Sequence, residues 1–352
     1  MQRMVHQFKA TVAAMLGRSG VLRMLHRMRR PHVLVLAYHR VTPDEDVASC
    51  AYPAMHVSTS SFDAQLAALA ELYRIVPLRD LGPILAGTLP LREHVAVITF
   101  DDGYRDNYRN ALPILAAHNV AATFFVSVDF VDRGESFWFD RVAAAARAWS
   151  ANVTARATIT GLPAEIVSAF DSPGSLAERA RLAAAFLKTL PDDERQRWVR
   201  ALEPLAQGAA SEDAPMQWDE VRALRQAGMS IGAHGVRHGI LTRMPGEEAA
   251  REIGDSVSLI GQRVGAPVET FAYPNGDVDD AVADLARRAG VRLGFTMAGR
   301  NVGPGIDALR IARRNVCEDT SRGRDGRFSA AYFWCEITGV FDVLAGRLLR
   351  RG

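Results

Sequence analysis

Short, continuous apolar runs alternate with longer stretches of helical periodicity along most of this chain. The runs at residues 33–37 (Val-Leu-Val-Leu-Ala) and 95–100 are typical of strands buried on both faces of a parallel sheet. The predicted strands are 33–37, 95–100, 121–128, 229–233, 269–273, 291–296 and 311–316. The predicted helices are 60–72, 108–118, 140–149, 219–227, 245–264 and 279–289. This alternation predicts an α/β fold and favours a barrel over an open sheet.

The alternation stops between residues 141 and 216. Alanine, arginine and glutamate dominate residues 175–205, where apolar residues recur at helical spacing. We therefore predict a helical insertion in the barrel, bounded by the loop 208–215. Its role stays open between a lid, a partner surface and a packing unit.

The two ends of the chain differ from the body. Residues 1–30 hold seven Arg or Lys and no Asp or Glu, so the remainder has a net charge of −5. Residues 11–30 predict a basic amphipathic helix that either lies on an anionic membrane surface or packs on the body. We assign 1–31 as this N-terminal segment, 32–328 as the barrel, and 329–352 as a C-terminal amphipathic segment of similar character.

Composition bounds the function and the compartment. The 352 residues are 48% hydrophobic and 23% charged, which excludes a disordered chain, and a net charge of +2 argues against nucleic acid as a partner. No uncharged apolar run reaches the ~18 residues of a spanning helix, and the apolar stretch 10–16 is too short for an export leader. Three scattered cysteines indicate free thiols. We expect a cytoplasmic protein, associated with the inner face of the membrane if its basic ends bind lipid.

Polar residues follow four of the predicted strands. They are Tyr38-His39-Arg40, Asp101-Asp102-Gly103-Tyr104, His234-Gly-Val-Arg-His238 and Tyr273-Pro-Asn-Gly276. Active sites of α/β barrels lie at the carboxyl ends of the strands, so these residues are expected to meet. A single histidine there is more often structural, and a single Asp-Asp-Gly is usually a turn. Their joint placement favours a site.

Two imidazoles and a carboxylate are the ligands that a mononuclear metal needs when one position stays open for water. The i, i+4 spacing of His234 and His238 lets both rings face one point if that segment forms a helical turn. Zinc suits these ligands, and so do cobalt, nickel and iron.

Three motifs resemble those of the polysaccharide deacetylases (NodB homology, carbohydrate esterase family 4). They are Thr99-Phe-Asp-Asp-Gly-Tyr104, His234-x3-His238 and Phe271-Ala-Tyr-Pro-Asn-Gly276. The opening Tyr38-His39-Arg40-Val41 is similar to members whose catalytic histidine precedes the aspartate pair. The resemblance runs from about residue 32 to residue 316, without the insertion. It implies a distorted (β/α) barrel and metal-dependent removal of N- or O-acetyl groups from sugars.

The resemblance also implies a role for each residue of the motifs. Asp101 would be the general base, while Asp102, His234 and His238 would hold the metal. A divalent metal would polarise the acetyl carbonyl and activate water. His39 would protonate the leaving group, and the backbone N–H at Asn275 would stabilise the oxyanion.

This sequence departs from the family pattern at three places. Gly235 stands where the family usually has Ser or Thr, and Ala272 stands where an arginine often pairs with the catalytic aspartate. The arginines that could supply that charge are Arg310, Arg313 and Arg314. No histidine follows His238, so the acid cannot come from the C-terminal position of the unpermuted members.

Aromatic residues near the motifs are candidates for substrate contact. Tyr104, Trp138 and Trp218 could stack on sugar rings, although Trp138 and Trp218 bracket the insertion and could instead anchor it.

The sequence thus predicts a metal-dependent hydrolase that deacetylates a sugar unit of a surface polysaccharide or a lipid-linked glycan precursor. Its partner would be an N-acetylated glycan or glycolipid. The alternatives are a deformylase, or another C–N amide hydrolase, acting on a lipid-linked aminosugar, and a non-catalytic sugar-binding or assembly protein on the same scaffold. The departures at Gly235 and Ala272 motivate the last of these.

Overall fold

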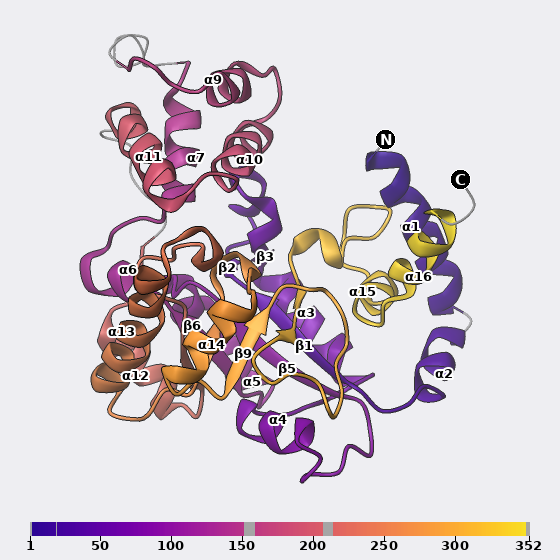
Figure 1. The fold of residues 1–352 in the computed structure, drawn as a ribbon. Helices are drawn as coiled ribbons and strands as arrows, with labels where there is room; N and C mark the ends of the chain where they lie inside the picture. Colours follow the sequence, from indigo (N-terminus) through magenta and orange to yellow (C-terminus); the bar gives the residue numbers. More distant parts are fainter. Residues whose placement is uncertain (1, 19, 151–158, 207–213, 350–352) are drawn as a thin grey trace.

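The computed structural model describes residues 2–18, 20–150, 159–206 and 214–349 (Figure 1). Within these ranges, nine strands form one sheet in which every pairing is parallel. They are β1 (Val33–Tyr38), β4 (Arg74–Ile75), β5 (Val95–Phe100), β6 (Ala122–Val126), β7 (Ser230–Ala233), β8 (Thr270–Ala272), β9 (Leu293–Thr296), β10 (Ile311–Ala312) and β11 (Arg314–Asn315). All residues of β1 and β5 are buried, as their apolar runs predict.

The two edge strands of the sheet, β10 and β11, flank a single residue, Arg313, and this closes the sheet into a barrel. The strand order is β10-β9-β8-β7-β6-β5-β1-β11, with β4 beside the start of β5. The two ends of this order, β10 and β11, are separated in the chain only by Arg313. One short segment therefore pairs with β9 on one side (Ile311 opposite Phe295) and with β1 on the other (Leu36 opposite Arg314).

Helices cover the outside of the barrel. They are α3 (Thr59–Ala70), α4 (Leu78–Leu85), a π-helical turn (Asn107–Ala111) continued by α5 (Leu112–Ala117), α6 (Val128–Arg133), α12 (Trp218–Gln226), α13 (Gly246–Val264) and α14 (Asp280–Arg288). Sequence periodicity missed β4, α4, α6 and the separate strand pair β2 (Arg40–Thr42) and β3 (His56–Ser58), because these elements are too short to show a period.

Among the described residues between β6 and β7, four helices stand apart from the barrel, at the upper left of Figure 1. They are α7 (Trp138–Ala148), α9 (Ala164–Asp171), α10 (Leu176–Leu187) and α11 (Asp192–Ala206). Their apolar side chains form a second hydrophobic cluster, which Tyr104, Phe130 and Ile240 join from the barrel side. The predicted helix 140–149 belongs to this unit, since Val142 and Ala146 pack in its core.

The two ends of the chain lie side by side (Figure 1). The N-terminal segment forms α1 (Gln2–Arg18) and α2 (Val21–Arg27), and the C-terminal segment forms α15 (Ala330–Ile337) and α16 (Val340–Leu349). The single helix expected at 11–30 is wrong, because Gly20 adopts a left-handed φ of 67° that separates α1 from α2. Among the described residues, no helix is both long and apolar enough to cross a bilayer.

Candidate metal and catalytic site

Four side chains that the sequence singles out meet at the carboxyl end of the barrel strands. Asp101 and Asp102 follow β5, and His234 and His238 follow β7. Nε2 of His234 and Nε2 of His238 lie 3.4 and 3.2 Å from Oδ1 of Asp102. All four side chains are buried, and ligand atoms of Asp102, His234 and His238 lie within 4.8 Å of one another.

Left-handed backbone conformations place these side chains. Asp102 has a φ of 79° and His238 a φ of 57°, a region that costs a non-glycine residue about 1 kcal/mol or more. Gly235, with a φ of 80°, turns the chain between the two histidines. The segment is an irregular loop, so the helical turn expected from the i, i+4 spacing is wrong. Strain of this kind clusters where a fold fixes functional groups.

The cluster of Asp102, His234 and His238 fits a divalent metal ion. Both carboxylate oxygens of Asp102 are buried without a hydrogen-bond partner among the described residues, which is costly unless a cation lies nearby. Nδ1 of His234 donates to the carbonyl oxygen of Ala272 at 2.6 Å, so Nε2 is the atom of this ring that would bind a metal. Two imidazoles and a carboxylate suit zinc, cobalt, nickel or iron.

The charges of the cluster move its pKa values in different directions. Burial by itself would raise the pKa of Asp102, but His234 and His238 hold it far below its ordinary value. Burial would lower the pKa of His234, but the carboxylates of Asp101 and Asp102 raise it. For His238, burial prevails and the pKa is lowered. The site therefore attracts positive charge and keeps one ring neutral, as a metal ligand must be.

Arg313, the residue that joins β10 to β11, is fully buried against Asp101. Its Nη1 and Nη2 donate to Oδ1 and Oδ2 of Asp101 at 2.6 and 2.7 Å, and Nη1 also donates to Oγ1 of Thr99 at 3.0 Å. Burial by itself would raise the pKa of Asp101, but the guanidinium of Arg313 holds it below its ordinary value. Asp101 is an ionised carboxylate in a fixed orientation.

The other two candidate arginines do not contact Asp101. Arg310 and Arg314 form ion pairs with other aspartates at the protein surface. Arg313 therefore supplies the positive charge that is missing at Ala272, and the structure resolves the three alternatives left open by the sequence.

His39 and Asn275 border the cluster. His39 follows β1, the neighbour of β5, and in its charged form helps to lower the pKa of Asp101 and Asp102. Asn275 lies in the turn after β8 with a φ of 62°, and its side chain donates to Asp277 at 2.7 Å. Because that side chain is engaged, a role at the site would fall to the backbone N–H of Asn275.

A second histidine cluster lies at the opposite, amino-terminal end of the barrel strands. His26 on α2, His32 before β1 and His94 before β5 offer ring nitrogens within 4.8 Å of one another. Burial and the charges of His94 and Arg29 lower the pKa of His26 and His32 to about 4. This cluster has no carboxylate and disfavours positive charge, in contrast to the cluster around Asp102.

Comparison with known proteins decides the family. The family model for polysaccharide deacetylases matches residues 89–158 and 184–294, which is just over half of the chain. The chain belongs to the polysaccharide deacetylase family. The Bacillus subtilis protein YxkH, whose name assigns it to the polysaccharide deacetylases, is 28% identical over 93 residues. That match spans 26% of this chain and 30% of the length of YxkH.

Two solved structures share the fold of this family member. The Streptococcus pyogenes deacetylase PplD, solved in complex with acetate, has a TM-score of 0.53 at 18% identity over 83% of this chain and 94% of PplD. IcaB from Ammonifex degensii has a TM-score of 0.55 at 19% identity, with the same coverage of both chains. The predicted distorted (β/α) barrel is confirmed.

Glu252 is a residue of this deacetylase-family site that sequence analysis missed. It is buried on α13, and its Oε2 accepts the backbone N–H groups of Val236 and Arg237 at 2.9 and 3.0 Å. A Cβ at Gly235 would lie 3.0 Å from the same oxygen. Glu252 thus holds the histidine loop where the family usually has a hydroxyl. In the sequence, Glu252 could be singled out only because it lies three positions after Ala249, on the face of α13 that is otherwise apolar and buried.

The three aromatic side chains that sequence analysis offers for sugar stacking differ in their exposure. Tyr104 and Trp138 are buried, and Trp138 belongs to the core of the insertion. The ring of Tyr104 lies 4.3 Å from the guanidinium carbon of Arg40, and its hydroxyl donates to Asp140 of α7 at 2.8 Å. Trp218 is half-buried and its indole N–H donates to α6. Tyr104 therefore links the insertion to the barrel, whereas Trp138 contacts Phe139 and Arg195 within the insertion.

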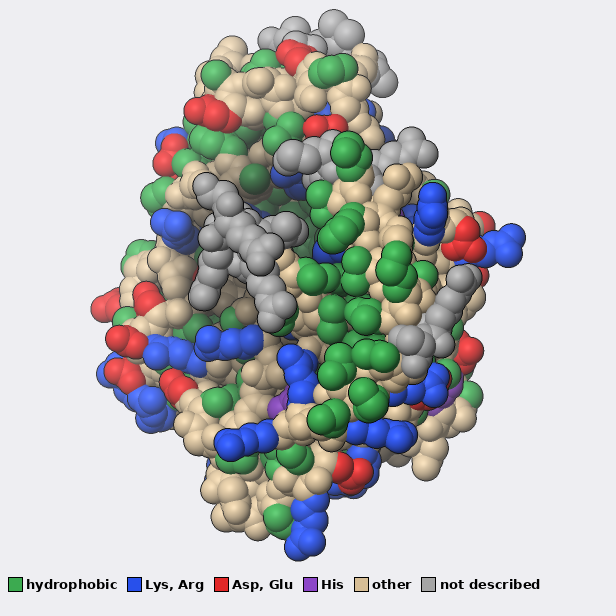
Figure 2. Space-filling view, turned by 90° about the vertical axis from the view of Figure 1, so that its right-hand side faces the viewer, with side chains coloured by type: hydrophobic (Ala, Val, Ile, Leu, Met, Phe, Trp, Pro, Cys, Tyr) green, Lys and Arg blue, Asp and Glu red, His purple; other side chains and the backbone are tan. Residues whose placement is uncertain are grey.

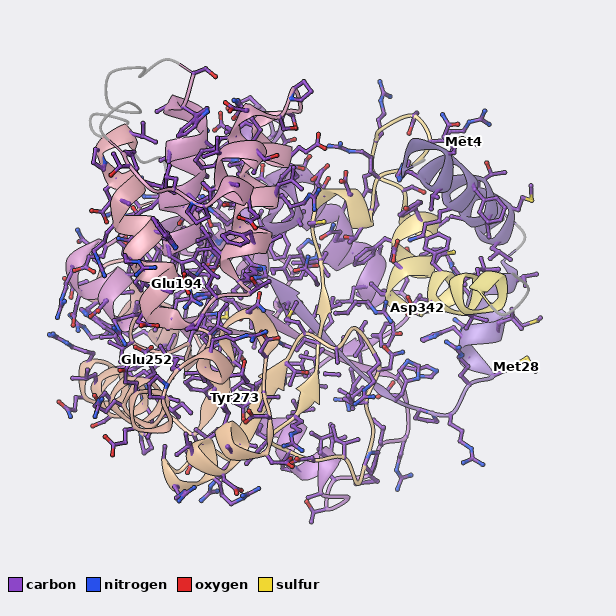
Figure 3. The ribbon with its side chains drawn as sticks, turned by 45° about the horizontal axis from the view of Figure 1, so that its top comes forward. Met4, Met28, Glu194, Glu252, Tyr273 and Asp342 are labelled. Atoms are coloured by element: carbon purple, nitrogen blue, oxygen red, sulfur yellow. The ribbon has the colours of Figure 1, made fainter. Side chains whose placement is uncertain are left out.

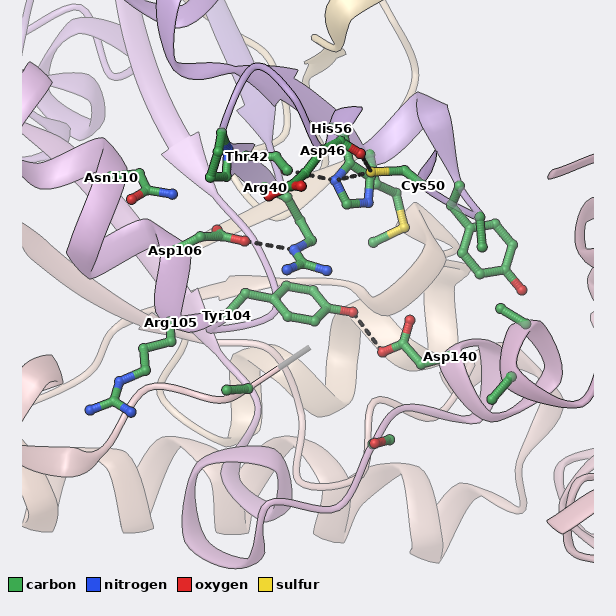
Figure 4. A pocket seen from close by; sticks show the side chains of 18 of the residues that line it. Arg40, Thr42, Asp46, Cys50, His56, Tyr104, Arg105, Asp106, Asn110 and Asp140 are labelled. Carbon is green, nitrogen blue, oxygen red and sulfur yellow. Dashed lines mark hydrogen bonds and ion pairs between the residues drawn. The ribbon is translucent and has the colours of Figure 1, made fainter. Parts of the chain in front are cut away.

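A cavity of about 860 Å³ lies beside the Asp101–Tyr104 turn, between the barrel and α7 (Figure 4). Five arginines are among its lining residues: Arg40, Arg105, Arg109, Arg141 and Arg147. Asp140 lies on its wall, and burial raises the pKa of Asp140 to about 7. The sequence could not reveal this cavity, because its walls come from distant segments of the chain.

Proposed function

We propose that this protein is a metal-dependent hydrolase that removes an N-acetyl, or O-acetyl, group from a sugar unit of a polysaccharide or a lipid-linked glycan precursor. One observation carries the proposal. Asp102, His234 and His238 converge, buried, beside the arginine-held carboxylate of Asp101 at the catalytic end of the barrel. This is the arrangement that metal-assisted hydrolysis requires.

The residues around this cluster have distinct tasks in the proposed reaction. Asp102, His234 and His238 would hold a divalent ion, which would supply Lewis acidity toward an acetyl carbonyl and a water molecule. Asp101 orients the attacking water and accepts its proton. Arg313 keeps Asp101 ionised and occupies one lone pair on each carboxylate oxygen, so a second lone pair on each is left for the proton.

His39 and Asn275 act on the acetyl group and the leaving amine. His39 approaches from the strand next to Asp101 and protonates the leaving nitrogen as the C–N bond breaks. The backbone N–H of Asn275 donates to the oxyanion of the tetrahedral intermediate. The products are acetate and a free amino sugar.

Several observations support a glycan substrate. The family is that of the polysaccharide deacetylases, and a structural neighbour from Aggregatibacter actinomycetemcomitans (TM-score 0.51) is described as a de-N-acetylase. The cavity of about 860 Å³ has a volume in the range that accommodates small ligands. Its lining residues include Tyr104 but none of Asp101, Asp102, His234 and His238. Three of its five arginines already form ion pairs, with Asp106, Glu220 and Glu203, so the cavity by itself does not select an anionic glycan.

The two departures that motivated a non-catalytic role have structural replacements. Arg313 provides the charge missing at Ala272, and Glu252 holds the loop beside Gly235. A protein that had lost turnover would have no need to keep Asp101 ionised and aimed at the metal ligands. These contacts favour an enzyme.

Release of acetate from N-acetylated chito-oligosaccharides, and from extracted lipid-linked glycans, tests the proposal. We expect chelation to abolish release, and zinc, cobalt, nickel or iron to restore it. Formate as the product would instead establish a deformylase. Equal acetate release before and after removal of the metal would contradict the proposed chemistry.

A further inference from the structure

Exposed apolar side chains concentrate on the two N-terminal helices. Among the described residues, seven of the ten exposed large hydrophobic side chains lie between residues 4 and 28: Met4, Val5, Phe8, Met15, Met24, Leu25 and Met28. Met4 and Met28 are 75% and 76% exposed and lie near the outer ends of α1 and α2 (Figure 3). Figure 2 looks onto this side of the molecule, where hydrophobic side chains form a column with Lys and Arg beside and below it.

Helix α1 packs on the protein with its small residues. Ala10 and Ala13 are buried, and a Cβ at Gly17 would lie 2.4 Å from Cβ of Ala331 on α15. Lys9 and Glu336 add an ion pair of 3.0 Å. A helix on an aqueous surface normally buries its large apolar residues and exposes polar ones. Val12, Leu16 and Leu22 do pack on the core. The exposed residues, such as Met4, Phe8 and Met28, face outward, so packing on the body does not account for them.

Positive charge surrounds the same face. The sequence has no Asp or Glu before Asp44, and Arg27, Arg29 and Arg30 are exposed. A cavity of about 510 Å³ beside α2 is lined by residues that include Arg29, Arg30, Arg300 and Arg314. Asp342 also lines it and pairs with Arg314, and Arg29 donates to the carbonyl oxygen of Thr338, so Arg30 and Arg300 are the guanidinium groups most open to a ligand. Guanidinium groups bind phosphate oxygens in pairs of parallel hydrogen bonds.

We infer that α1 and α2 form a docking surface for an anionic phospholipid bilayer. The exposed methionines and Phe8 enter the boundary between headgroups and acyl chains, and the arginines around the 510 Å³ cavity bind headgroup phosphates. Charge decides against a second copy of this chain as the occupant. A twofold contact would place one basic surface against another, because residues 1–30 hold seven Arg or Lys and the carboxylates paired with them, Glu71 and Glu336, offset only two. The inference does not rest on the proposed deacetylase activity.

Sedimentation of the full chain with vesicles tests this inference. We expect binding to vesicles of 70% phosphatidylcholine and 30% phosphatidylglycerol, and much weaker binding to pure phosphatidylcholine. Phe8→Asp with Met28→Asp should weaken binding roughly tenfold or more, because each side chain loses its apolar transfer. Arg29→Glu with Arg30→Glu should weaken it by roughly fivefold or more per residue. Leu182→Asp, an exposed leucine on the insertion, is the matched control and should bind like the parent.

No sedimentation with anionic vesicles, or binding that Phe8→Asp with Met28→Asp leaves unchanged, would overturn the inference. A dimer in sedimentation velocity that the same variant dissociates would assign the surface to a second copy and overturn it as well. All substituted residues are exposed, so unchanged thermal unfolding and unchanged acetate release from a soluble oligosaccharide would show that the variants are folded.

Discussion

At the scale of single residues, the candidate chemistry depends on contacts between residues far apart in the chain. Asp101 and Asp102 are adjacent, yet Asp101 is held by Arg313 and Asp102 faces two histidines. The aspartates and histidines could be predicted to meet, because parallel strands end at the same edge of a sheet. Arg313 could not be distinguished from its neighbours, because only the closure of the barrel decides which arginine faces inward.

Replacement of Asp101 by asparagine tests its role as the base. The variant should keep its metal, since Asp102, His234 and His238 remain, and kcat should fall by about 10²–10⁴-fold because the proton acceptor is lost. Metal content by elemental analysis and the rate of acetate release measure the two effects. Activity near that of the parent would remove Asp101 from the mechanism.

Replacement of Arg313 by lysine should change the pH dependence of the reaction. Arg313 lowers the pKa of Asp101, so the parent keeps its base ionised down to low pH. A lysine has one nitrogen in place of the two that pair with Asp101, so it stabilises the carboxylate less and the pKa of Asp101 rises. The acidic limb of the kcat/KM profile then moves to higher pH. Arg310→Lys, at the surface, is the matched control and should leave the profile unchanged. An unshifted limb in Arg313→Lys would contradict the coupling.

At the scale of elements, two contacts position the site from outside it. The buried face of α13 supplies Glu252 to the histidine loop, and α7 supplies Asp140 to Tyr104. The strands and most barrel helices could be predicted from periodicity. These two contacts could not, because each is a polar side chain on a helix whose partner depends on tertiary packing.

The variant Glu252→Gln tests the support of the histidine loop. The glutamine side chain keeps one acceptor oxygen but has no negative charge, so it binds the backbone N–H groups of Val236 and Arg237 more weakly than the carboxylate does. The loop that carries His234 and His238 is then held less firmly. Metal affinity should fall about 10–100-fold, measured by competition with a chromophoric chelator. Glu247→Gln, at an exposed position of the same helix, should bind metal like the parent. Equal affinities in both variants would exclude this role.

Asp140→Asn should alter the pH dependence of stability. Burial raises the pKa of Asp140 to about 7, so the folded protein binds this proton more tightly than the unfolded chain does. The free energy of unfolding therefore falls as pH rises from about 4 to 7, by at most about 1.4 kcal/mol per pH unit. The variant should lose less stability over this range than the parent or the control Asp255→Asn, at an exposed position of α13. Parallel denaturation curves for all three would contradict the shifted pKa.

At the scale of the whole molecule, the barrel, the insertion and the basic termini could be predicted from the sequence, but how they lie relative to one another could not. Continuous apolar runs identify buried strands such as 95–100 without structural knowledge. The pairing of α1 with α15 and the arginine-lined cavities depend on where distant segments come to lie. The outward orientation of Phe8 and Met28 was equally out of reach, since the helix pattern alone did not show which face is buried.

Anomalous diffraction at the zinc edge, from crystals of the zinc-loaded protein, tests the central claim most directly. The account predicts one peak at about 2.0–2.2 Å from a carboxylate oxygen of Asp102 and from Nε2 of both His234 and His238, with Asp101 still paired to Arg313. Zinc absent from this position, or bound instead at His26, His32 and His94, would contradict it.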